Sequence, residues 1–441
     1  MGAAILYTGR RMRFLADLHL HSKFSRATSK DMTFDTMAAW AKVKGIRLLA
    51  TADFTHPEWL FLTKRKLEPA GNGFFRLASV QPPDNALLRP FAPAPDDVHF
   101  VLSTELSFIY SKKGRVRKVH LLLLAPDLET VEKINARLAG VGNLRSDGRP
   151  ILGLDARLFV RMVADISPRC VVIPSHIWTP WFSLFGANSG FDAIEECFEE
   201  MTPFIFALET GLSSDPAMNW RLSALDRFAL VSNSDAHSPA RIGREANAFE
   251  TDFGFKGLIE AIRGRDPARF LYTVEFFPEE GKYHFDGHRK CEVVLTPKES
   301  MGRGDLCPVC GKKLTIGVAH RIEELADRDE PPPPGLRVPF KSLVPLNEII
   351  GGACGKSAEC QSVWETYFRF IREFGDEHRV LTEVPAAELG RVQPSRVAEG
   401  VERMRKGLIK IAPGHDGEYG TIDIFAGEAQ ASAAPDQMSL F

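Results

Sequence analysis

Residues 13–22, RFLADLHLHS, join a short apolar run to two histidines that stand one residue apart. A helix-like stretch that ends at Gly45 and a second apolar run, IRLLATADF at 46–54, follow this segment. Together they predict a strand, a helix and a second strand. Because side chains two residues apart on a strand face the same side, His19 and His21 can point together into one site.

The alternation of apolar and helix-like stretches continues to about residue 275. The expected strands lie at 99–110, 117–125, 170–176, 204–210 and 228–237. Helix-like stretches include 127–140 and 223–228, and the Pro-rich stretch 81–97 is expected to be a loop. Alternation of this kind predicts parallel strands beneath an outer layer of helices. We therefore expect an α/β fold built on a distorted (β/α) barrel.

The chain changes character after the barrel. We expect the barrel domain to occupy 1–278, a small Gly-rich and Cys-bearing module to occupy 279–330, and a mainly helical domain to occupy 331–425. The helical domain opens with PPPPG, which is a stiff linker. The Ala-rich segment 426–441 is expected to be a disordered tail.

The composition excludes several classes of protein. The 441 residues are 44% hydrophobic, enough for more than one core, and the net charge is −2, so any nucleic-acid-binding surface must be local. No window reaches the roughly 18 uninterrupted apolar residues of a membrane span. The short apolar run at the N-terminus precedes the arginines, which is the wrong order for a secretory signal, and seven cysteines do not indicate a disulfide scaffold. We expect a cytoplasmic protein.

Polar side chains with metal-binding chemistry stand at the ends of the expected strands. They are Asp17, His19, His21, Asp53, Glu105, His120, His176, Asp235 and His237. α/β barrels place their chemistry at the C-terminal ends of the strands. Any one of these histidines, taken alone, is as readily a core residue as a ligand, but six or more such residues at successive strand ends predict a metal site. Histidine with carboxylate suits zinc, manganese or iron, and shared carboxylates favour multinuclear sites.

The same motifs resemble those of a known superfamily. DLHLHS, TADFTH, TEL, KVH, PSH and SDAHS stand in the order of the motifs of the polymerase-and-histidinol-phosphatase (PHP) superfamily, over residues 13 to about 250. The resemblance implies a first metal held by His19, His21, Glu105 and Asp235, and a second held by Glu105, His120 and His176. It also implies that these ligands, with Asp17 and His237, are the catalytic residues. A metal pair lowers the pKa of a bridging water and stabilises charge on a phosphoryl group, so the implied reaction is phosphate-ester hydrolysis.

A third metal site is where the sequence departs from the superfamily. Many relatives have a histidine directly after the Asp of the second motif, whereas Phe54 stands here and His56 follows two residues later. The usual ligand shortly after the first motif is also absent, where residues 25–27 stand. We therefore expect two divalent metals, zinc, manganese or magnesium. A third, held by His56 or Asp53 together with His237, is left open.

The module at 279–330 carries two short chelating pairs separated by fifteen residues. The four residues are His288, Cys291, Cys307 and Cys310. Two such turns around one tetrahedral ion are typical of a structural zinc site, and a fold this small depends on the ion for stability. The cysteine pair in CPVCG carries the prediction, while His284 or His320 remains an alternative to His288. We expect one structural zinc.

A more specific resemblance extends well beyond the metal motifs. A PHP barrel followed by a Cys-bearing module and a helical unit resembles the endonuclease Q family. The matching stretches are 51–59, 141–155, 174–192, 207–220, 307–328 and 413–425. That family nicks DNA on the 5′ side of deaminated bases, mainly hypoxanthine and uracil, and of abasic sites. The resemblance therefore implies a DNA repair endonuclease whose partner is damaged DNA, with a DNA-binding helical domain.

Basic and aromatic residues near the expected site fit this function. The candidate DNA-binding residues are Lys112, Lys113, Arg115, Arg117, Lys118, Arg145, Arg149, Trp178 and Trp181. Basic side chains can contact phosphates, and aromatic residues beside a metal site can stack on an extruded base. The alternative for the basic segment is a solvated hairpin turn. The alternative for the aromatic residues is that half of them pack the mouth of the barrel.

The last five residues form a short motif after the expected tail. They are Gln437, Met438, Ser439, Leu440 and Phe441. This sequence resembles the bacterial sliding-clamp-binding peptide, with Met438 in place of the commoner leucine and of similar volume. The resemblance implies that the tail recruits the protein to the replication clamp.

Two other functions compete with the endonuclease. One is a PHP phosphatase that acts on a small phosphomonoester such as histidinol phosphate, but such an enzyme needs neither a zinc module nor an additional C-terminal domain. The other is a non-catalytic DNA- or clamp-binding protein with a degenerate barrel. Degenerate barrels lose metal ligands, whereas the first two ligand sets are complete here.

Overall fold

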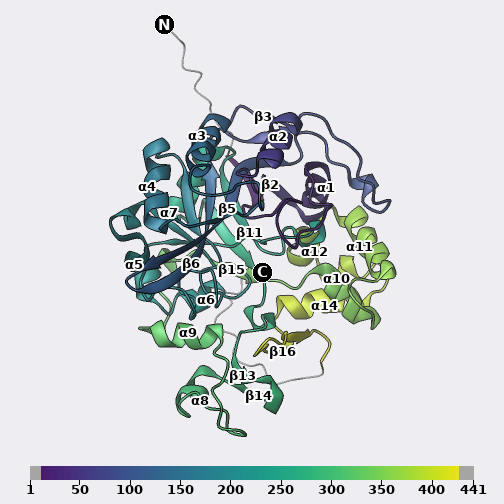
Figure 1. Cartoon of the computed structure of the whole chain (residues 1–441). Coiled ribbons are helices and arrows are strands. Elements are labelled where there is room, and N and C mark those ends of the chain that lie inside the picture. The colour runs from purple at the N-terminus through teal and green to yellow at the C-terminus, as the bar shows by residue number, and fades with distance from the viewer. Residues whose placement is uncertain (1–10, 427–441) are drawn as a thin grey trace.

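The computed structural model describes residues 11–426 and shows an α/β body from which a small module projects at the bottom (Figure 1). Within that range eleven strands form one mixed sheet, and the expected α/β class is confirmed. The main path runs through β15 (Phe340–Ser342), β12 (Phe270–Glu275), β11 (Ala246–Asp252), β1 (Arg11–Asp17), β2 (Ile46–Ala50), β5 (His99–Lys112), β4 (Phe75–Leu77) and β3 (Leu67–Pro69). Off this path lie β6 (Arg115–Ala125), β7 (Ile151–Leu152) and β8 (Val171–Pro174).

The strands are not all parallel, and the sequence prediction is wrong on this point. β1 pairs in parallel with β2, and β2 with β5, but β5–β6, β6–β8 and β1–β11 are antiparallel. β5 and β6 form a hairpin because only Lys113 and Gly114 connect them, and both have positive φ angles, 51° and 74°. β9 (Ala207–Glu209) and β10 (Ala229–Val231) make a separate parallel pair. Over residues 11–426 this pair is linked to the rest by the parallel bridge between Leu20 and Ala236 and by a backbone hydrogen bond from Ile177 to Glu209, without a continuous strand ladder around a barrel.

The run of four leucines in β6 shows why the strands read as continuous apolar segments. Leu122 and Leu124 belong to one buried cluster with Ala16 of β1, and Leu121 and Leu123 belong to a second cluster on the other face. Because both faces of the sheet are covered, successive side chains are apolar on both sides. The polar residues that interrupt or follow these apolar runs therefore do not serve to pack the core and are candidates for a functional site.

Helices cover the sheet and lie around it in Figure 1. The longer ones are α1 (Phe34–Lys44), α2 (Pro57–Lys66), α3 (Leu128–Leu138), α4 (Ala156–Ile166) and α7 (Phe255–Gly264). α1 ends at Gly45 as the sequence predicts, with a φ angle of 83° there, and a Cβ at this position would collide with the Asp376 side chain. The predicted helix at 223–228 is only the short helix η3 (Ser223–Leu225), and the loop at 81–97 contains η1 (Arg89–Phe91). The remaining short helices of this part are α5 (Ile194–Phe198), η2 (Glu199–Phe204), α6 (Pro216–Asn219) and η4 (Pro239–Arg241).

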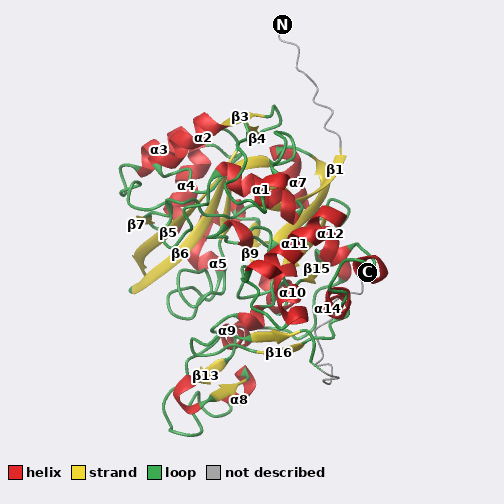
Figure 2. Ribbon diagram, turned by 90° about the vertical axis from the view of Figure 1, so that its right-hand side faces the viewer, coloured by secondary structure: helices red, strands yellow, loops and turns green. Residues whose placement is uncertain are grey.

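The projecting module is assembled from two distant parts of the chain, as the turned view in Figure 2 shows. Its first part contains η5 (Pro278–Glu280), β13 (Asp286–His288), η6 (Arg289–Cys291), β14 (Val293–Leu295), α8 (Pro297–Met301) and α9 (Val318–Leu325). The second part is the hairpin of β16 (Lys410–Ala412) and β17 (Thr421–Asp423). Asp416 between these two strands accepts hydrogen bonds from the backbone of Arg289 and the hydroxyl of Thr315. The sequence division at 279–330 did not anticipate this second part.

A helical unit packs beside α1, at the right of Figure 1. Its helices are η7 (Pro334–Leu336), α10 (Leu346–Cys354), α11 (Gln361–Phe374), α12 (Glu377–Thr382), α13 (Ala386–Leu389) and α14 (Arg396–Arg405). Lys44 at the end of α1 forms a buried ion pair with Glu377 at the start of α12. None of the helices in the described range has the length and apolar character needed to cross a bilayer.

Candidate metal centre and active site

Two groups of potential metal ligands meet just beyond the ends of β1, β8 and β10, but Glu105 and His120 lie within β5 and β6 and not at strand ends as expected. One group is His19, His21 and Asp235, and the other is Glu105, His120 and His176. In each group the ligand atoms lie within 4.8 Å of one another. The residues come from segments up to 216 positions apart, so only the fold brings them together.

Glu105 on β5 stands between these two groups. Its Oε2 atom lies 3.5 Å from Nε2 of His19 and 3.3 Å from Nε2 of His21. Its Oε1 atom lies 3.0 Å from Nδ1 of His120 and 3.2 Å from Nε2 of His176. Each carboxylate oxygen thus faces one group of ligands. This is the arrangement of a carboxylate shared by two metal ions.

Three buried polar atoms in the centre fit a cation. Nε2 of His19, Nε2 of His21 and Oδ1 of Asp235 are inaccessible to solvent and make no well-aligned hydrogen bond, although the last two atoms lie 3.0 Å apart. Leaving such atoms without a partner is costly, and coordination of a positive ion would satisfy all three. Although burial opposes ionisation, His120 and Arg149 hold the pKa of Glu105 well below its usual range. The shared carboxylate is therefore ionised, as a ligand must be.

Asp17 and Asp53 lie beside the centre and outside both ligand groups. Asp17 accepts hydrogen bonds from the backbone nitrogens of Ser234 (3.1 Å) and Gly243 (3.0 Å), and burial raises its pKa to about 6. It ties the end of β1 to the segment that carries Asp235. Asp53 lies 3.3 Å from Nδ1 of His21 and accepts a hydrogen bond from the backbone of Ser22 (2.7 Å). Neither aspartate belongs to a ligand group among the described residues; the contacts of both are with segments that carry candidate ligands, while Asp17 was expected among the catalytic residues and Asp53 was a candidate for the open third site.

The two histidines of the open third site do not join either ligand group among the described residues. His56 is buried and its ring stacks on Phe24, with 4.4 Å between ring centroids. His237 lies against His21 at 4.5 Å, and its Nδ1 atom is 2.8 Å from the backbone oxygen of Asp235. The structure thus brings His237 to the edge of the centre and leaves His56 apart from it.

Glu209 is a residue of the centre that the sequence analysis missed. Both of its carboxylate oxygens lie 3.0 Å from Nδ1 of His19. The same carboxylate accepts hydrogen bonds from the backbone nitrogen of His176 (2.9 Å) and from the amide of Asn233 (2.8 Å). The available signal was a charged residue near the end of the apolar segment FIFALET, comparable to Asp17 at the end of its own apolar run.

Arg149, which the sequence suggested as a phosphate-binding residue, lies directly beside the candidate ligand Glu105. Its guanidinium is 2.9 Å from Oε2 of Glu105. Asp147 fixes this loop by accepting a hydrogen bond from the backbone of Arg149 (3.0 Å). Gly148 lies so close to Asp53 that a Cβ there would overlap the carboxylate. The loop therefore holds Arg149 tightly against the ligand Glu105.

The other predicted DNA-binding cations divide into two kinds. Lys112 pairs with Glu199 at 2.8 Å, and Arg117 is buried, where it donates to the backbone of Gly190. These two side chains hold the protein together and are not free for DNA, which corrects the sequence interpretation. The remaining cations are at least partly exposed: Lys113, Arg115, Lys118 and Arg145. Arg117 turns inward because alternate side chains of β6 face the core.

The predicted aromatic residues divide in the same way. Trp178 is buried and donates its indole N–H to Asn219 at 2.7 Å, so it is a core residue rather than a stacking platform. Trp181 is 46% exposed, and its ring lies edge-on to Tyr283 at 5.7 Å. Both Trp181 and Tyr283 line a cavity of about 680 Å³.

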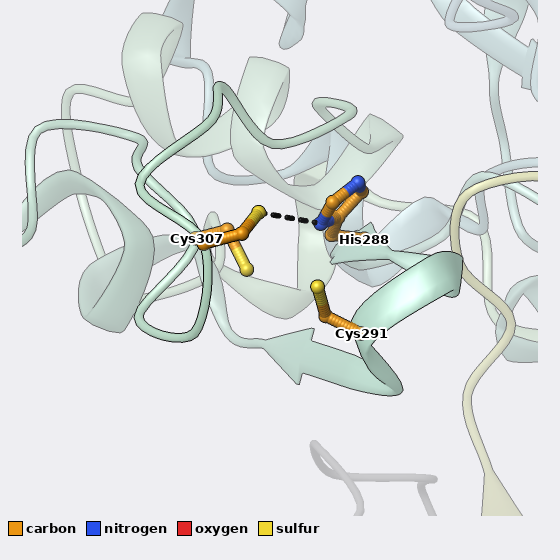
Figure 3. Close-up of side chains that lie close together, drawn as sticks. His288, Cys291 and Cys307 are labelled. Carbon is orange, nitrogen blue, oxygen red and sulfur yellow. Dashed lines mark hydrogen bonds between the residues drawn. The ribbon is translucent and has the colours of Figure 1, made fainter.

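The four predicted zinc ligands come together in the projecting module. His288, Cys291 and Cys307 point toward one another in Figure 3, and Sγ of Cys310 lies 3.3 Å from Nδ1 of His288. Although burial opposes it, backbone N–H groups of the CPVCG turn lower the pKa of Cys307 to about 6. An ionised thiolate among sulfur and nitrogen donors suits zinc.

The two alternative histidines of the module lie elsewhere. His320 pairs with Asp286, with 2.6 Å between Nδ1 and Oδ2. His284 is buried, and burial lowers its pKa to about 4. Neither belongs to the four-residue group, so the group that could hold an ion among the described residues contains His288.

Comparison with known proteins finds similarity along almost the whole chain. The chain is 34% identical to PfuEndoQ, a lesion-specific endonuclease from Pyrococcus furiosus, and matches its crystal structure with a TM-score of 0.80 over 93% of this chain and 95% of that chain. It is 33% identical to endonuclease Q in a crystal complex with a 27-mer duplex that carries an abasic lesion at the active site. That match has a TM-score of 0.79 and covers 97% of this chain and 100% of that chain.

Two further proteins and one protein family are similar to this chain in sequence. The YqxK protein of Bacillus subtilis is 28% identical over 93% of this chain and 99% of its own length. The MJ0043 protein of Methanocaldococcus jannaschii is 35% identical over 253 residues, which are 56% of this chain and 31% of that protein. The chain therefore spans about a third of that relative. The family described as the MJ0043 C-terminal domain matches residues 345–408, in the helical unit.

Proposed function

The chain belongs to the endonuclease Q family, and we propose that it is a metal-dependent DNA repair endonuclease that cuts the phosphodiester on the 5′ side of a lesion. The proposed lesions are the deaminated bases hypoxanthine and uracil, together with abasic sites. The similarity to an endonuclease bound to an abasic duplex, over 97% of this chain, supports damaged DNA as the partner.

The observation that carries the proposal is the position of Glu105 between two complete ligand groups. One divalent cation would be held by His19, His21, Asp235 and Glu105, and a second by Glu105, His120 and His176. Zinc, manganese and magnesium are the candidate ions, and a third ion beside His237 stays open. A degenerate barrel that only binds DNA would not retain both groups.

The chemistry follows from these groups and from the residues around them. Divalent cations at this centre would supply an activated water and offset the charge that develops on the phosphoryl group. Glu209 and Asp53 fix the rings of His19 and His21 through their Nδ1 atoms, which leaves the Nε2 atoms to face the centre. Arg149 keeps a positive charge beside Glu105, where a phosphate would approach.

The cavity next to the centre is suited to an extruded nucleotide. Trp181 and Tyr283 line it, and so does Thr179, whose hydroxyl lies 3.1 Å from Nδ1 of His176. Enzymes that act at a single nucleotide of a duplex take it out of the stack and hold it against aromatic side chains. The volume of about 680 Å³ accommodates a nucleobase of any kind.

A nicking assay tests the proposed function. Duplexes that carry one inosine, uracil or abasic site would be incubated with the protein and with Mn²⁺, Mg²⁺ or a chelator, and the matched undamaged duplex is the control. We expect one cut on the 5′ side of each lesion, only with metal. Hydrolysis of a small phosphomonoester without nicking would favour the phosphatase, and binding without any cut would favour the non-catalytic alternative.

A further inference from the structure

The cavity of about 680 Å³ approaches the metal centre through two of its lining residues, Thr179 and Arg244. Thr179 connects it to the ligand His176. The wall of the cavity also contains Arg244. The Nε atom of Arg244 donates a hydrogen bond of 3.0 Å to the backbone oxygen of Ser234, the residue directly before the ligand Asp235. Arg244 is therefore held at a fixed place beside this ligand.

The charge of Arg244 has no ion-pair partner within residues 11–426. Over that part of the chain its side chain makes one hydrogen bond, the one to Ser234, and no carboxylate lies within ion-pair distance of it. The side chain is partly buried. Burial lowers its pKa, the nearby carboxyl groups of Asp235 and Glu245 act against this shift without pairing with it directly, and arginine stays protonated. A half-buried cation without a counter-ion is unfavourable unless a ligand supplies the negative charge.

The other cations near the centre and cavity are already engaged or solvated. Arg241 pairs with Glu348 (3.1 Å) and Glu359 (3.3 Å), and Arg149 pairs with Glu105. Lys282 is exposed and lies over the ring of Tyr419 at 4.8 Å. Arg244 is therefore the partly buried guanidinium of this wall that is left to receive an anion.

The carboxyl groups of the cavity do not offset this charge. Glu348 is paired with Arg241. Burial, together with the charges of Glu348 and Glu279, raises the pKa of Glu280 to about 8, so Glu280 is mostly protonated at neutral pH. The lining is thus positive on the side of Arg244.

From this geometry we infer that Arg244 binds a phosphate of the DNA backbone that flanks the lesion, on the Asp235 side of the metal centre. The inference rests on the proposed endonuclease function and adds a substrate contact to it. The terminal nitrogens of a guanidinium donate in parallel to two phosphate oxygens, a geometry that lysine does not reproduce. The contact is made to the backbone, so it should serve every lesion equally.

Single-turnover nicking by wild type, Arg244→Gln and Arg244→Lys tests this contact. We expect Arg244→Gln to raise the half-saturating enzyme concentration by roughly ten- to hundredfold, by the same factor for uracil, inosine and abasic duplexes. The slope of log affinity against log salt should fall by about one, and Arg244→Lys should recover part of the affinity. Metal content and thermal unfolding, measured on each variant, control for damage to the neighbouring ligand Asp235.

A scan of uncharged backbone links identifies the phosphate. Methylphosphonate would replace one phosphodiester at a time around the lesion. We expect one link whose neutralisation weakens wild type, weakens Arg244→Lys less, and does not further weaken Arg244→Gln. Absence of such a link, or wild-type affinity in Arg244→Gln, would overturn the inference. So would inhibition by inorganic phosphate that depends on Arg244 while no link is sensitive. Wild-type nicking of the unmodified duplex reports the proposed function independently of all these outcomes.

Discussion

The carboxylate of Glu209 holds the ring of His19 from the side opposite the metal-facing nitrogen. Both oxygens of Glu209 lie 3.0 Å from Nδ1, whereas Nε2 of His19 faces Glu105 at 3.5 Å and Asp235 at 3.8 Å. A carboxylate in this position keeps the proton on Nδ1 and leaves the lone pair of Nε2 for a cation. Glu209 is thus a positioning residue of the proposed metal centre.

We expect Glu209→Gln to weaken metal binding by about ten- to hundredfold, since an amide orients the imidazole less strongly. Nicking measured against Mn²⁺ concentration should show a higher half-saturating concentration with substantial recovery at excess metal. If Glu209 only stabilised the fold, excess Mn²⁺ would not restore nicking by the variant. Glu129→Gln, which changes an exposed glutamate paired with Lys133, is the matched control and should behave as wild type.

Loss of a ligand should separate binding from cutting. His19→Ala and Asp235→Ala each remove a ligand at the open end of a packed body, so both proteins should fold and still bind a damaged duplex, as judged by gel shift. Nicking should be lost, because the remaining donors no longer complete the first group. Full nicking by both variants at the metal concentration used for wild type would show that the site is assigned wrongly.

Much of this centre was predictable from the sequence because its ligands interrupt or follow apolar strand segments. The spacing of His19 and His21 places both on one face, and the tripeptide with Asp235 and His237 follows the run that forms β10. Glu209 was not predicted, because a lone glutamate after an apolar run carries no histidine beside it. Its role depends on contacts with His19 and Asn233 that only the fold creates.

Other features depended on contacts between distant segments. Arg117 looked like part of a basic DNA-binding stretch, but its guanidinium packs over Phe191 at 4.2 Å, a contact across more than seventy residues of sequence. The antiparallel β5–β6 pair depended on positive φ angles at Lys113 and Gly114, which a strand–helix pattern does not reveal. The addition of Asp416 to the projecting module likewise has no local signal.

The buried pair of Lys44 and Glu377 should stabilise the contact between the helical unit and the body. Glu377 also accepts hydrogen bonds from the Tyr367 hydroxyl (2.6 Å) and the backbone of Leu346 (2.8 Å). Glu377→Ala leaves the ammonium group of Lys44 buried without a carboxylate partner, although it still lies over the rings of Trp40 and Tyr367. The variant should lower the free energy of unfolding by about 3–5 kcal/mol in urea titrations.

The exposed pair of Lys133 and Glu129 provides the comparison for that measurement. Lys133→Met should change the free energy of unfolding by less than about 0.5 kcal/mol, because exposed ion pairs contribute little. An equally small effect of Glu377→Ala would mean that the buried pair does not stabilise this contact.

Substitution of the module's cysteines should remove its metal and leave the catalytic centre intact. We expect the double variant Cys307→Ser, Cys310→Ser to contain one zinc fewer per chain by elemental analysis, since two of four donors are removed. Discrimination between damaged and undamaged duplex should fall more than the cutting rate at saturating enzyme. Cys354→Ser, an exposed cysteine outside the group, is the control. Unchanged zinc in the double variant would contradict the assignment.

The last five residues, Gln437 to Phe441, lie outside the described range and carry a prediction from sequence alone. If QMSLF acts as a sliding-clamp-binding peptide, Leu440 and Phe441 would enter an apolar pocket of the clamp while Gln437 hydrogen-bonds beside it. Removal of residues 437–441 should then abolish binding to purified bacterial clamp in a pull-down and leave nicking of short oligonucleotides unchanged. Replacing Leu440 and Phe441 by alanine should have the same effect with the chain length preserved. Equal clamp binding by the full-length and truncated proteins would show that this segment does not recruit the clamp.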